Sequence, residues 1–209
     1  MASPLTITWH GHACFSLEMD GWRIVLDPYA DGSVPGLQPL RLTAHAVYTS
    51  HSHGDHGYTQ AVELQSAPGP SPWRVTPIPS FHDDAQGSKR GPNTIHLLEA
   101  GEFRVAHMGD IGCALTPEQQ QALSHLDALL LPVGGFYTIG PAEASAMADS
   151  LSPRVVIPMH YRTDDHGLAP IGRLEDFLAL RKDVTVYSGN SITLTADTPV
   201  QTAVLQYVP

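Results

Sequence analysis

Nine residues beginning at Ser50, SHSHGDHGY, concentrate side chains that are suited to metal chemistry. Imidazole nitrogens and carboxylate oxygens bind divalent ions such as zinc at about 2.0–2.2 Å. His51 and His53 alternate and can point to one side of a loop, whereas Asp55 and His56 can reach another side. This division favours two ions held side by side, with the remaining donors supplied from elsewhere in the chain.

Further candidate donors follow other apolar segments. His82 follows IPSF, Asp110 lies in HMGDIG, His160 ends VIPMH, and Asp27 ends IVLD. Polar side chains at the ends of consecutive strands can meet at one edge of a sheet. The two oxygens of Asp110 can each take one ion, which predicts a bridging role for this carboxylate.

Short β-strands dominate the first half of the predicted structure and would carry these donors at their ends. Alternation of apolar and polar residues, rich in aromatic and β-branched side chains, indicates strands. An Asp-Gly pair at residues 20–21 joins two of them and predicts a hairpin. The predicted strands are Leu5–Trp9, Cys14–Met19, Trp22–Asp27, Ala46–Ser50, Trp73–Pro79, Thr94–Glu99 and Phe103–Gly109.

Helices and buried strands alternate in the second half. Thr116, Pro117 and Gln119 form the pattern of a capping box with proline at the first helical position. The predicted helices are Pro117–Leu126, Pro141–Leu151 and Gly172–Lys182, and the predicted strands are Asp127–Val133, Arg154–His160, Thr185–Tyr187, Ser191–Leu194 and Ala203–Tyr207. We therefore expect two sheets with helices outside, in a single domain over residues 1–209.

The composition excludes several classes of protein. No apolar segment approaches the ~20 residues of a membrane span, and the N-terminal segment has no secretory signal pattern. Two cysteines, Cys14 and Cys113, cannot form a disulfide framework, so we expect a cytoplasmic protein. The net charge of -10 argues against a broad nucleic-acid surface, and 12 histidines against 11 Lys plus Arg favour metal binding.

The order of these motifs resembles the five-motif signature of the metallo-β-lactamase superfamily. The segments WHGHACF, MGDIG, PVGGFYTIGPAEA and IPMHY resemble the branch that includes ascorbate-6-phosphate lactonase and related uncharacterised Zn-dependent hydrolases. The resemblance implies a four-layer αββα sandwich, with two mixed β-sheets and helices on the outer faces.

The resemblance also implies a role for each donor. His51, His53 and His82 correspond to the ligands of a first metal ion, and Asp55, His56 and His160 to those of a second, with Asp110 as the bridge. Asp27 corresponds to a group that supports the histidine loop without binding metal.

Other histidines compete for these roles. His96 lies inside a predicted strand and is better explained as structural. His107, three residues before Asp110, is expected either to hydrogen-bond a ligand or to be purely structural. His166 lies in a polar loop and lacks the strand-end position of His160.

Four further residues are candidates for contact with the reaction or the substrate. His12 matches the GHA of the family text and is either catalytic or structural. Tyr137 and Tyr161 are expected to line the pocket, unless they are core residues. Arg90, beside Lys89 and soon after His82, is positioned to meet a phosphate or carboxylate of a substrate.

The implied chemistry is hydrolysis. Two divalent ions, with zinc favoured over manganese, lower the pKa of a shared water, and the resulting hydroxide, oriented by Asp55, attacks a small ester, lactone or phosphoester. The alternatives are a metal-dependent nuclease and a non-catalytic metal-binding protein. The expected partner is a small molecule, with no nucleic acid and no membrane, and a homo-oligomer is compatible with the sequence.

Overall fold

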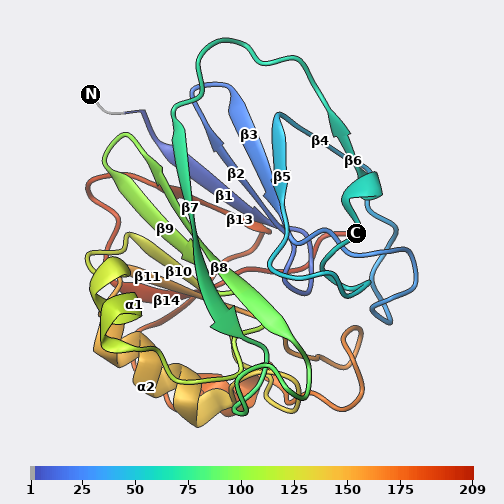
Figure 1. The fold of residues 1–209 in the computed structure, drawn as a ribbon. Coiled ribbons are helices and arrows are strands. Elements are labelled where there is room, and N and C mark those ends of the chain that lie inside the picture. The colour runs from blue at the N-terminus through green and yellow to red at the C-terminus, as the bar shows by residue number, and fades with distance from the viewer. Residues whose placement is uncertain (1–2) are drawn as a thin grey trace.

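Two β-sheets pack face to face in the computed structural model, which describes residues 3–209 (Figure 1). The first sheet contains, from edge to edge, β13 (Ser191–Leu194), β1 (Leu5–Trp9), β2 (Phe15–Met19), β3 (Trp22–Leu26) and β5 (Ala46–Tyr48). Its strands are antiparallel except for the parallel pair β3–β5. The predicted hairpin between β2 and β3 is present, and Asp20 and Gly21 both have the positive φ angles of a type I′ turn, 51° and 77°.

The second sheet has seven strands. From edge to edge they are β12 (Val184–Val186), β14 (Gln201–Val204), β11 (Val155–Met159), β10 (Ala128–Pro132), β9 (Phe103–His107), β8 (Pro92–Ala100) and β7 (Trp73–Phe81). The neighbouring strands β9, β10, β11, β14 and β12 pair in parallel in that order. The pairs β7–β8 and β8–β9 are antiparallel. The carboxyl ends of β9, β10 and β11 therefore lie at one edge, from which Asp110 and His160 project.

Helices cover the outer face of the seven-stranded sheet. Helix α2 (Pro141–Leu151) packs on β10 and on α3 (Leu174–Leu178), and α1 (Pro117–Ala122) lies on the same side (Figure 1). The capping box at Thr116 is present, with reciprocal hydrogen bonds to Gln119. Both α1 and α3 are shorter than predicted. In α3 the final turn tightens to three-residue hydrogen bonds after Leu178, because the chain must turn into β12.

Within residues 3–209, no α-helix covers the outer face of the five-stranded sheet. A small parallel pair, β4 (Leu42–Ala44) and β6 (Val62–Leu64), the 3-10 turn η1 (Thr59–Ala61) and the loop over 28–41 form this layer. Tyr29, Val34 and Leu37 of the loop pack there on Cys14 and Val25 of the sheet. Four layers are thus present, but this one is built mainly from loop, so the expectation of helices on both outer faces holds only for the seven-stranded sheet.

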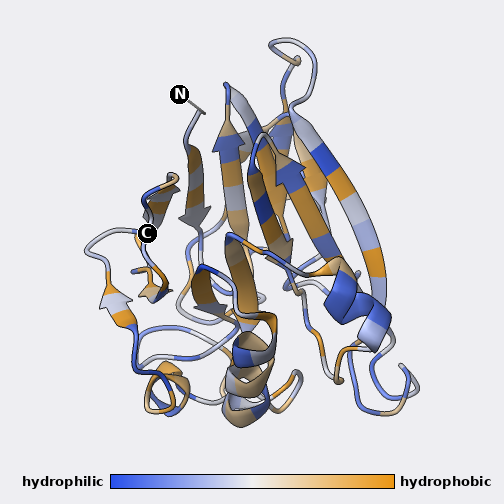
Figure 2. Cartoon of the chain, turned by 90° about the vertical axis from the view of Figure 1, so that its left-hand side faces the viewer, coloured by the Kyte–Doolittle hydropathy of each residue, from blue (hydrophilic) through white to orange (hydrophobic). Residues whose placement is uncertain are grey.

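The main core lies between the two sheets. Leu5, Ile7 and Trp9 of β1 are buried, while the residues between them are half-buried, as the alternation predicted. Every residue of β10 and β11 is buried, because sheet and helix cover both faces. Figure 2 shows orange residues along the strands and blue residues on exposed helix surfaces. Among the helices of residues 3–209, none is both long enough and apolar enough to cross a bilayer.

Candidate metal centre

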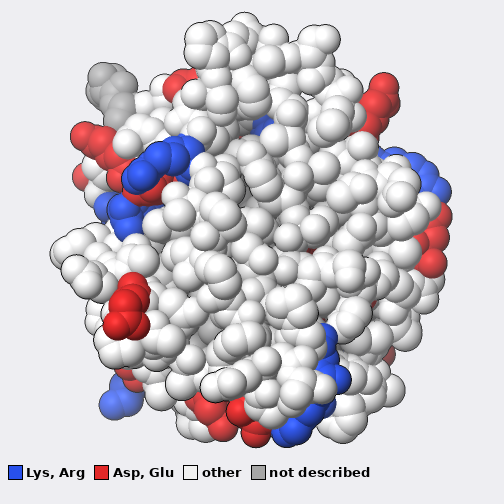
Figure 3. Space-filling view, viewed as in Figure 1, with Lys and Arg blue, Asp and Glu red and all other residues white. Residues whose placement is uncertain are grey.

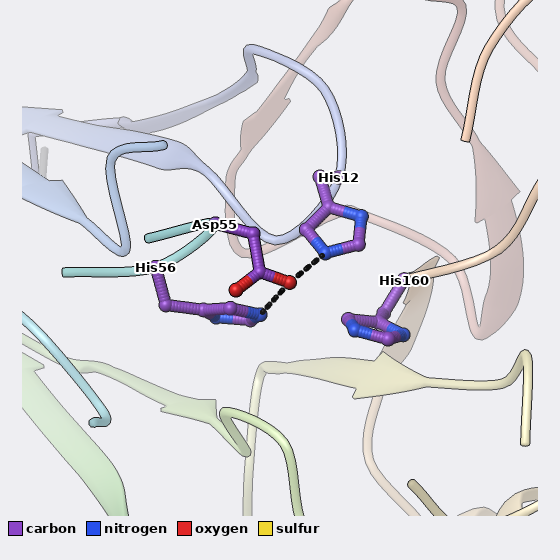
Figure 4. A group of neighbouring side chains, drawn as sticks. All are labelled: His12, Asp55, His56 and His160. Carbon is purple, nitrogen blue, oxygen red and sulfur yellow. Dashed lines mark hydrogen bonds and ion pairs between the residues drawn. The ribbon is translucent and has the colours of Figure 1, made fainter. Parts of the chain in front are cut away.

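Two groups of metal-donor side chains meet where the two sheets come together. The donor atoms of His51, His53 and His82 all lie within 4.8 Å of one another. A second group, within the same limit, contains His12, Asp55, His56 and His160 (Figure 4). The three histidines of the first group are those expected to bind one ion, and Asp55, His56 and His160 are those expected to bind the other. His12 lies with the second group.

Asp110 lies between the two groups and is 1% exposed. Its Oδ2 atom is 3.2 Å from the Nε2 atoms of both His82 and His160, and 3.9 Å from that of His51. Its Oδ1 atom is 3.2 Å from His56 Nε2. Ligands about 2.0–2.1 Å from a tetrahedral ion are roughly 3.3 Å apart, so these separations suit a carboxylate shared by two ions.

Hydrogen bonds on the far side of three rings aim their Nε2 atoms at this centre. His56 Nδ1 lies 2.8 Å from Asp27 Oδ2, and His82 Nδ1 lies 3.1 Å from the carbonyl oxygen of Tyr137. The Ser50 hydroxyl donates to the Asp27 carboxylate, so His51 Nδ1 donates to Ser50 Oγ at 2.9 Å. Such partners orient metal-binding histidines and leave Nε2 free as the donor.

Asp27 supports the histidine loop from a fully buried position. Besides His56, its carboxylate accepts the backbone N–H of Ser50 at 2.6 Å and the Ser50 hydroxyl at 2.5 Å. Burial alone would raise the pKa of this carboxyl, but nearby His107 and the bonds from His56 and Ser50 lower it to about 2. With its oxygens occupied in this way, Asp27 acts as a supporting group, as the resemblance implied.

The backbone at the site is shaped by unusual conformations. His12, Asp27 and His160 have φ angles of 51°, 46° and 53°, in the left-handed region that non-glycine residues rarely adopt. Gly109 has a φ of 55°, and a Cβ atom there would lie 2.3 Å from Asn93 Oδ1. Such conformations cost free energy and cluster at functional sites, where they direct side chains that a regular strand would point elsewhere.

The charge distribution around the site calls for cations. Burial lowers the pKa of His12 to about 4 and that of His51 to about 3, so these imidazoles are neutral, which is their metal-binding form. The Asp110 carboxylate raises the pKa of His56 despite burial, and the pKa of Asp110 is well below its usual range. Within residues 3–209, no Lys or Arg pairs with Asp27, Asp55 or Asp110.

Unpaired buried atoms provide a direct test of whether metal ions fit. The Nε2 atoms of His51, His56 and His160 and the Oδ1 atom of Asp110 are buried without a well-aligned hydrogen bond. His56 Nε2 and Asp110 Oδ1 lie 3.2 Å apart, but not in hydrogen-bonding geometry. Unsatisfied buried polar atoms are rare in native proteins and need an explanation. All four atoms face the same centre, so divalent ions would satisfy them together.

His12 and His107 differ in their relation to this centre. His12 Nε2 is 3.3 Å from Asp55 Oδ2, and its ring centroid lies 4.1 Å from that of His160. The described hydrogen bonds of His107 include none to a predicted metal ligand. The expectation that His107 orients a ligand is therefore corrected, and its structural role remains. Its Nε2 pairs with the carbonyl of Ala13 and its Nδ1 accepts the N–H of Gly109, so its contribution is to the backbone before Asp110.

Tyr161 lies in the core and not in the lining of the pocket, and the core was one of the two positions expected for it. It is 4% exposed and packs on Trp9, with 5.6 Å between ring centroids. His160 and Tyr161 are adjacent in the chain, and their side chains point in different directions. His160 faces the metal centre, whereas Tyr161 packs in the core. His96 pairs with the carbonyl of Thr49, which agrees with the structural role expected for it. His166 packs on Trp9 and lies outside both donor groups.

A cavity of about 460 Å³ opens onto the centre and is lined by donors from both groups. Tyr137 and Arg90 also line it, as predicted. One amino group of Arg90 donates to the carbonyl of Phe136 at 3.0 Å, and its guanidinium carbon lies 5.7 Å from the centroid of the Tyr137 ring. Both residues are therefore held at the mouth of the metal site.

Asp83 organises the loop that carries Arg90. Its buried carboxylate accepts the backbone N–H groups of Ala85, Gly87, Lys89 and Arg90 at 2.8–3.0 Å. Burial would raise the pKa of Asp83, but these four donors lower it to about 2.

We expect Asp83→Asn to loosen this loop, because an amide has one acceptor oxygen where the carboxylate has two. Trypsin cleavage after Lys89 and Arg90 should become roughly tenfold faster, since local opening exposes the chain to the protease. Timed digestion followed by mass spectrometry measures the rate. Asp84→Asn is the matched control, because this exposed neighbour pairs only with Lys89; equal rates in both variants would show that Asp83 does not order the loop.

Comparison with known proteins agrees with this geometry. The family described as Beta-lactamase superfamily domain matches residues 6–160, which is more than half of the chain. The chain belongs to this superfamily. A structure of a metallo-β-lactamase superfamily protein from Thermotoga maritima is 35% identical, with a TM-score of 0.73, and the match covers 96% of this chain and 97% of that one. These matches confirm the predicted fold class.

Further matches lie at lower sequence identity. A metal-dependent hydrolase of Methanopyrus kandleri is 27% identical in an alignment 196 residues long. The match covers 76% of this chain and 85% of the relative. Human tRNase Z, short form, is 11% identical with a TM-score of 0.56, covers 76% of this chain and 93% of that chain, and shares the fold alone. Together with the donor cluster, these findings identify the superfamily member as a metal-dependent hydrolase.

Two residues that position the site were missed in the sequence. Ser50 links Asp27 to His51, and its place directly before the histidine loop was the available signal. Asn93 accepts the N–H of Asp110 at 2.9 Å and donates to the carbonyl of Met108. An asparagine inside a strand is unusual, and this could have marked Asn93 as functional.

Proposed function

We propose that this superfamily member is a binuclear hydrolase. It binds two divalent ions, zinc in preference to manganese, and cleaves a small ester, lactone or phosphoester. The observation that supports this proposal best is the pair of donor groups joined by Asp110, whose carboxylate lies 3.2 Å from nitrogens of both groups. One tetrahedral ion could not use all seven predicted donors.

The side chains around the centre divide the work of catalysis. Two bound ions would supply Lewis acidity and a water of lowered pKa at neutral pH. Asp55 lines the 460 Å³ cavity and accepts a hydrogen bond from the attacking water, and His12 holds the Asp55 carboxylate in place. The Tyr137 hydroxyl is the candidate hydrogen-bond donor to the substrate, because Tyr137 lines the same cavity.

The surface supports a small-molecule substrate. On the face shown in Figure 3, the basic residues are few and scattered, with acidic residues beside several of them. Neutralising a polyanion needs many basic contacts, and the net charge is -10. We therefore propose a small-molecule partner and neither a nucleic acid nor a membrane. The free cysteines, Cys14 and Cys113, support a reducing, cytoplasmic location.

Metal analysis combined with a substrate panel tests the proposal. Protein reconstituted with zinc should hold two ions per chain and hydrolyse members of a panel of lactones, carboxylic esters, phosphodiesters and phosphomonoesters. At most one tightly held ion after reconstitution would contradict the binuclear site. Submicromolar binding and metal-dependent cleavage of structured RNA at physiological salt, without turnover of the panel, would favour a nuclease.

Arg90→Ala should weaken the recognition of anionic substrates. One amino group of Arg90 is held by Phe136, and within residues 3–209 its side chain forms no ion pair, so other N–H donors remain for a phosphate or carboxylate. We expect KM to rise about tenfold for anionic substrates and less than twofold for neutral ones, with little change in kcat. Steady-state kinetics on matched charged and neutral esters measure both. Equal changes for the two classes would exclude this role.

A further inference from the structure

A second and larger cavity adjoins the metal pocket. Its volume is about 700 Å³, within the range of small-molecule sites, and it lies between α2, the segment over 112–115 and the loop over 136–140. Lys89, Arg90 and Tyr137 line both cavities, so these three residues form the neck between them.

Apolar side chains form one part of the wall of this cavity, and charged and polar side chains form the rest. Leu115, Ile139 and Met147 line it from three different segments, together with the small side chains of Ala114 and Ala146. An apolar concavity that opens beside a reactive centre is a typical place for the non-reacting part of a substrate.

The charged groups around the cavity are mostly engaged elsewhere. Asp83 accepts four backbone N–H groups, and Asp84 pairs with Lys89 at 2.7 Å. Glu143 lies in the first turn of α2, where the helix dipole stabilises a carboxylate. Within residues 3–209, Arg90 and Glu143 form no ion pair, so Arg90 at the neck is the one cationic lining residue left for an anionic part of a ligand.

Backbone strain marks the mouth of this cavity. Phe136 has a φ of 60° and is 63% exposed, although an aromatic residue is a rare occupant of the left-handed region. Arg90 donates a hydrogen bond to the carbonyl of Phe136. The Phe136 ring packs edge-on against the Tyr137 ring, with 4.7 Å between the ring centroids. Phe136 lies in a tight turn after Gly135, and strained backbone of this kind clusters at ligand-contacting segments.

We infer that the 700 Å³ cavity is a substrate subsite that binds an uncharged apolar substituent, while the scissile group lies in the metal pocket beyond the Arg90–Tyr137 neck. The preferred substrate is thus an ester, lactone or phosphoester bearing an alkyl or aryl chain of several carbons. This inference rests on the proposed hydrolase function, and it adds the class of substrate.

A series of 4-nitrophenyl esters with acyl chains of two to six carbons tests the subsite. A fully buried methylene contributes up to about fourfold in binding, so kcat/KM should rise at least tenfold across the series. Ala146→Trp and Ala114→Trp, which fill the cavity from two different segments at exposed positions, should abolish the rise. Ala122→Trp, at an exposed helical position that does not line the cavity, should preserve it.

Binding of 1-hexanol to the metal-free protein gives a readout that does not depend on catalysis. The methyl resonance of Met147 should shift on titration, much less with ethanol, and not in Ala146→Trp. If no ester is hydrolysed but this shift occurs, the subsite stands and the proposed function fails. A flat chain-length profile without a Met147 shift would overturn the subsite while leaving hydrolysis intact. A steep profile that Ala146→Trp and Ala114→Trp leave unchanged would also overturn it.

Discussion

Asp110→Asn is expected to lower kcat by more than about 100-fold and to reduce bound zinc from two ions per chain to one or none. The carboxylate is the donor closest to both groups, and an amide would turn N–H hydrogens toward the Nε2 atoms of His82 or His56. Loss of a partner that merely orients a metal ligand costs 10- to 100-fold, so loss of the shared donor should cost more. Elemental analysis and single-turnover kinetics measure the two effects.

His53→Ala separates the two donor groups and completes this test. Only the first group contains His53, so this variant should lose one ion and retain the other. His53 is exposed and lies outside the core, and the fold should therefore be unchanged. Asp84→Asn, which changes an exposed carboxylate in the neighbouring loop, should keep both ions. Full metal content and wild-type turnover in Asp110→Asn would show that the centre is not shared.

Asp27→Ala should destabilise the protein by about 3–5 kcal/mol, because it leaves a buried network without its acceptor. The Ser50 N–H, the Ser50 hydroxyl and the Nδ1 atom of His56 would all lose their partner in a site that water does not reach. Metal affinity should fall 10- to 100-fold as well, since His56 loses the group that orients its ring.

Urea unfolding in the presence of a chelator measures the stability loss without a contribution from metal. Competition with a chromophoric chelator then measures the metal affinity of the variant. Asp27→Asn should retain part of the stability, since its oxygen can still accept the Ser50 N–H, but little of the metal affinity. Asp31→Ala is the matched control, because its pair with Arg41 is exposed to solvent and such pairs contribute little to stability. Unchanged stability in Asp27→Ala would exclude the network as a source of folding energy.

The sequence by itself determined the features that depend on neighbouring residues. The Asp-Gly hairpin and the Thr116 capping box formed as predicted, because each follows from hydrogen bonds within a few residues. The fully apolar segments became buried strands for a similarly local reason, since they have no polar face. Placement of His82, Asp110 and His160 just after strands also followed from hydrophobic patterning, and parallel strands bring such ends to one edge.

Only the tertiary structure decided how distant residues meet. His12, Asp55 and His160 come from loops far apart in the chain, and their contact depends on how one sheet packs against the other. The sequence left both the pocket and the core open for Tyr161. It lies in the core, because the left-handed backbone of His160 determines where the next side chain points. No periodicity in the sequence reports such a backbone angle, since the surrounding packing imposes it. For the same reason, the cavity beside Arg90 became visible only once α2 and the two loops were in place.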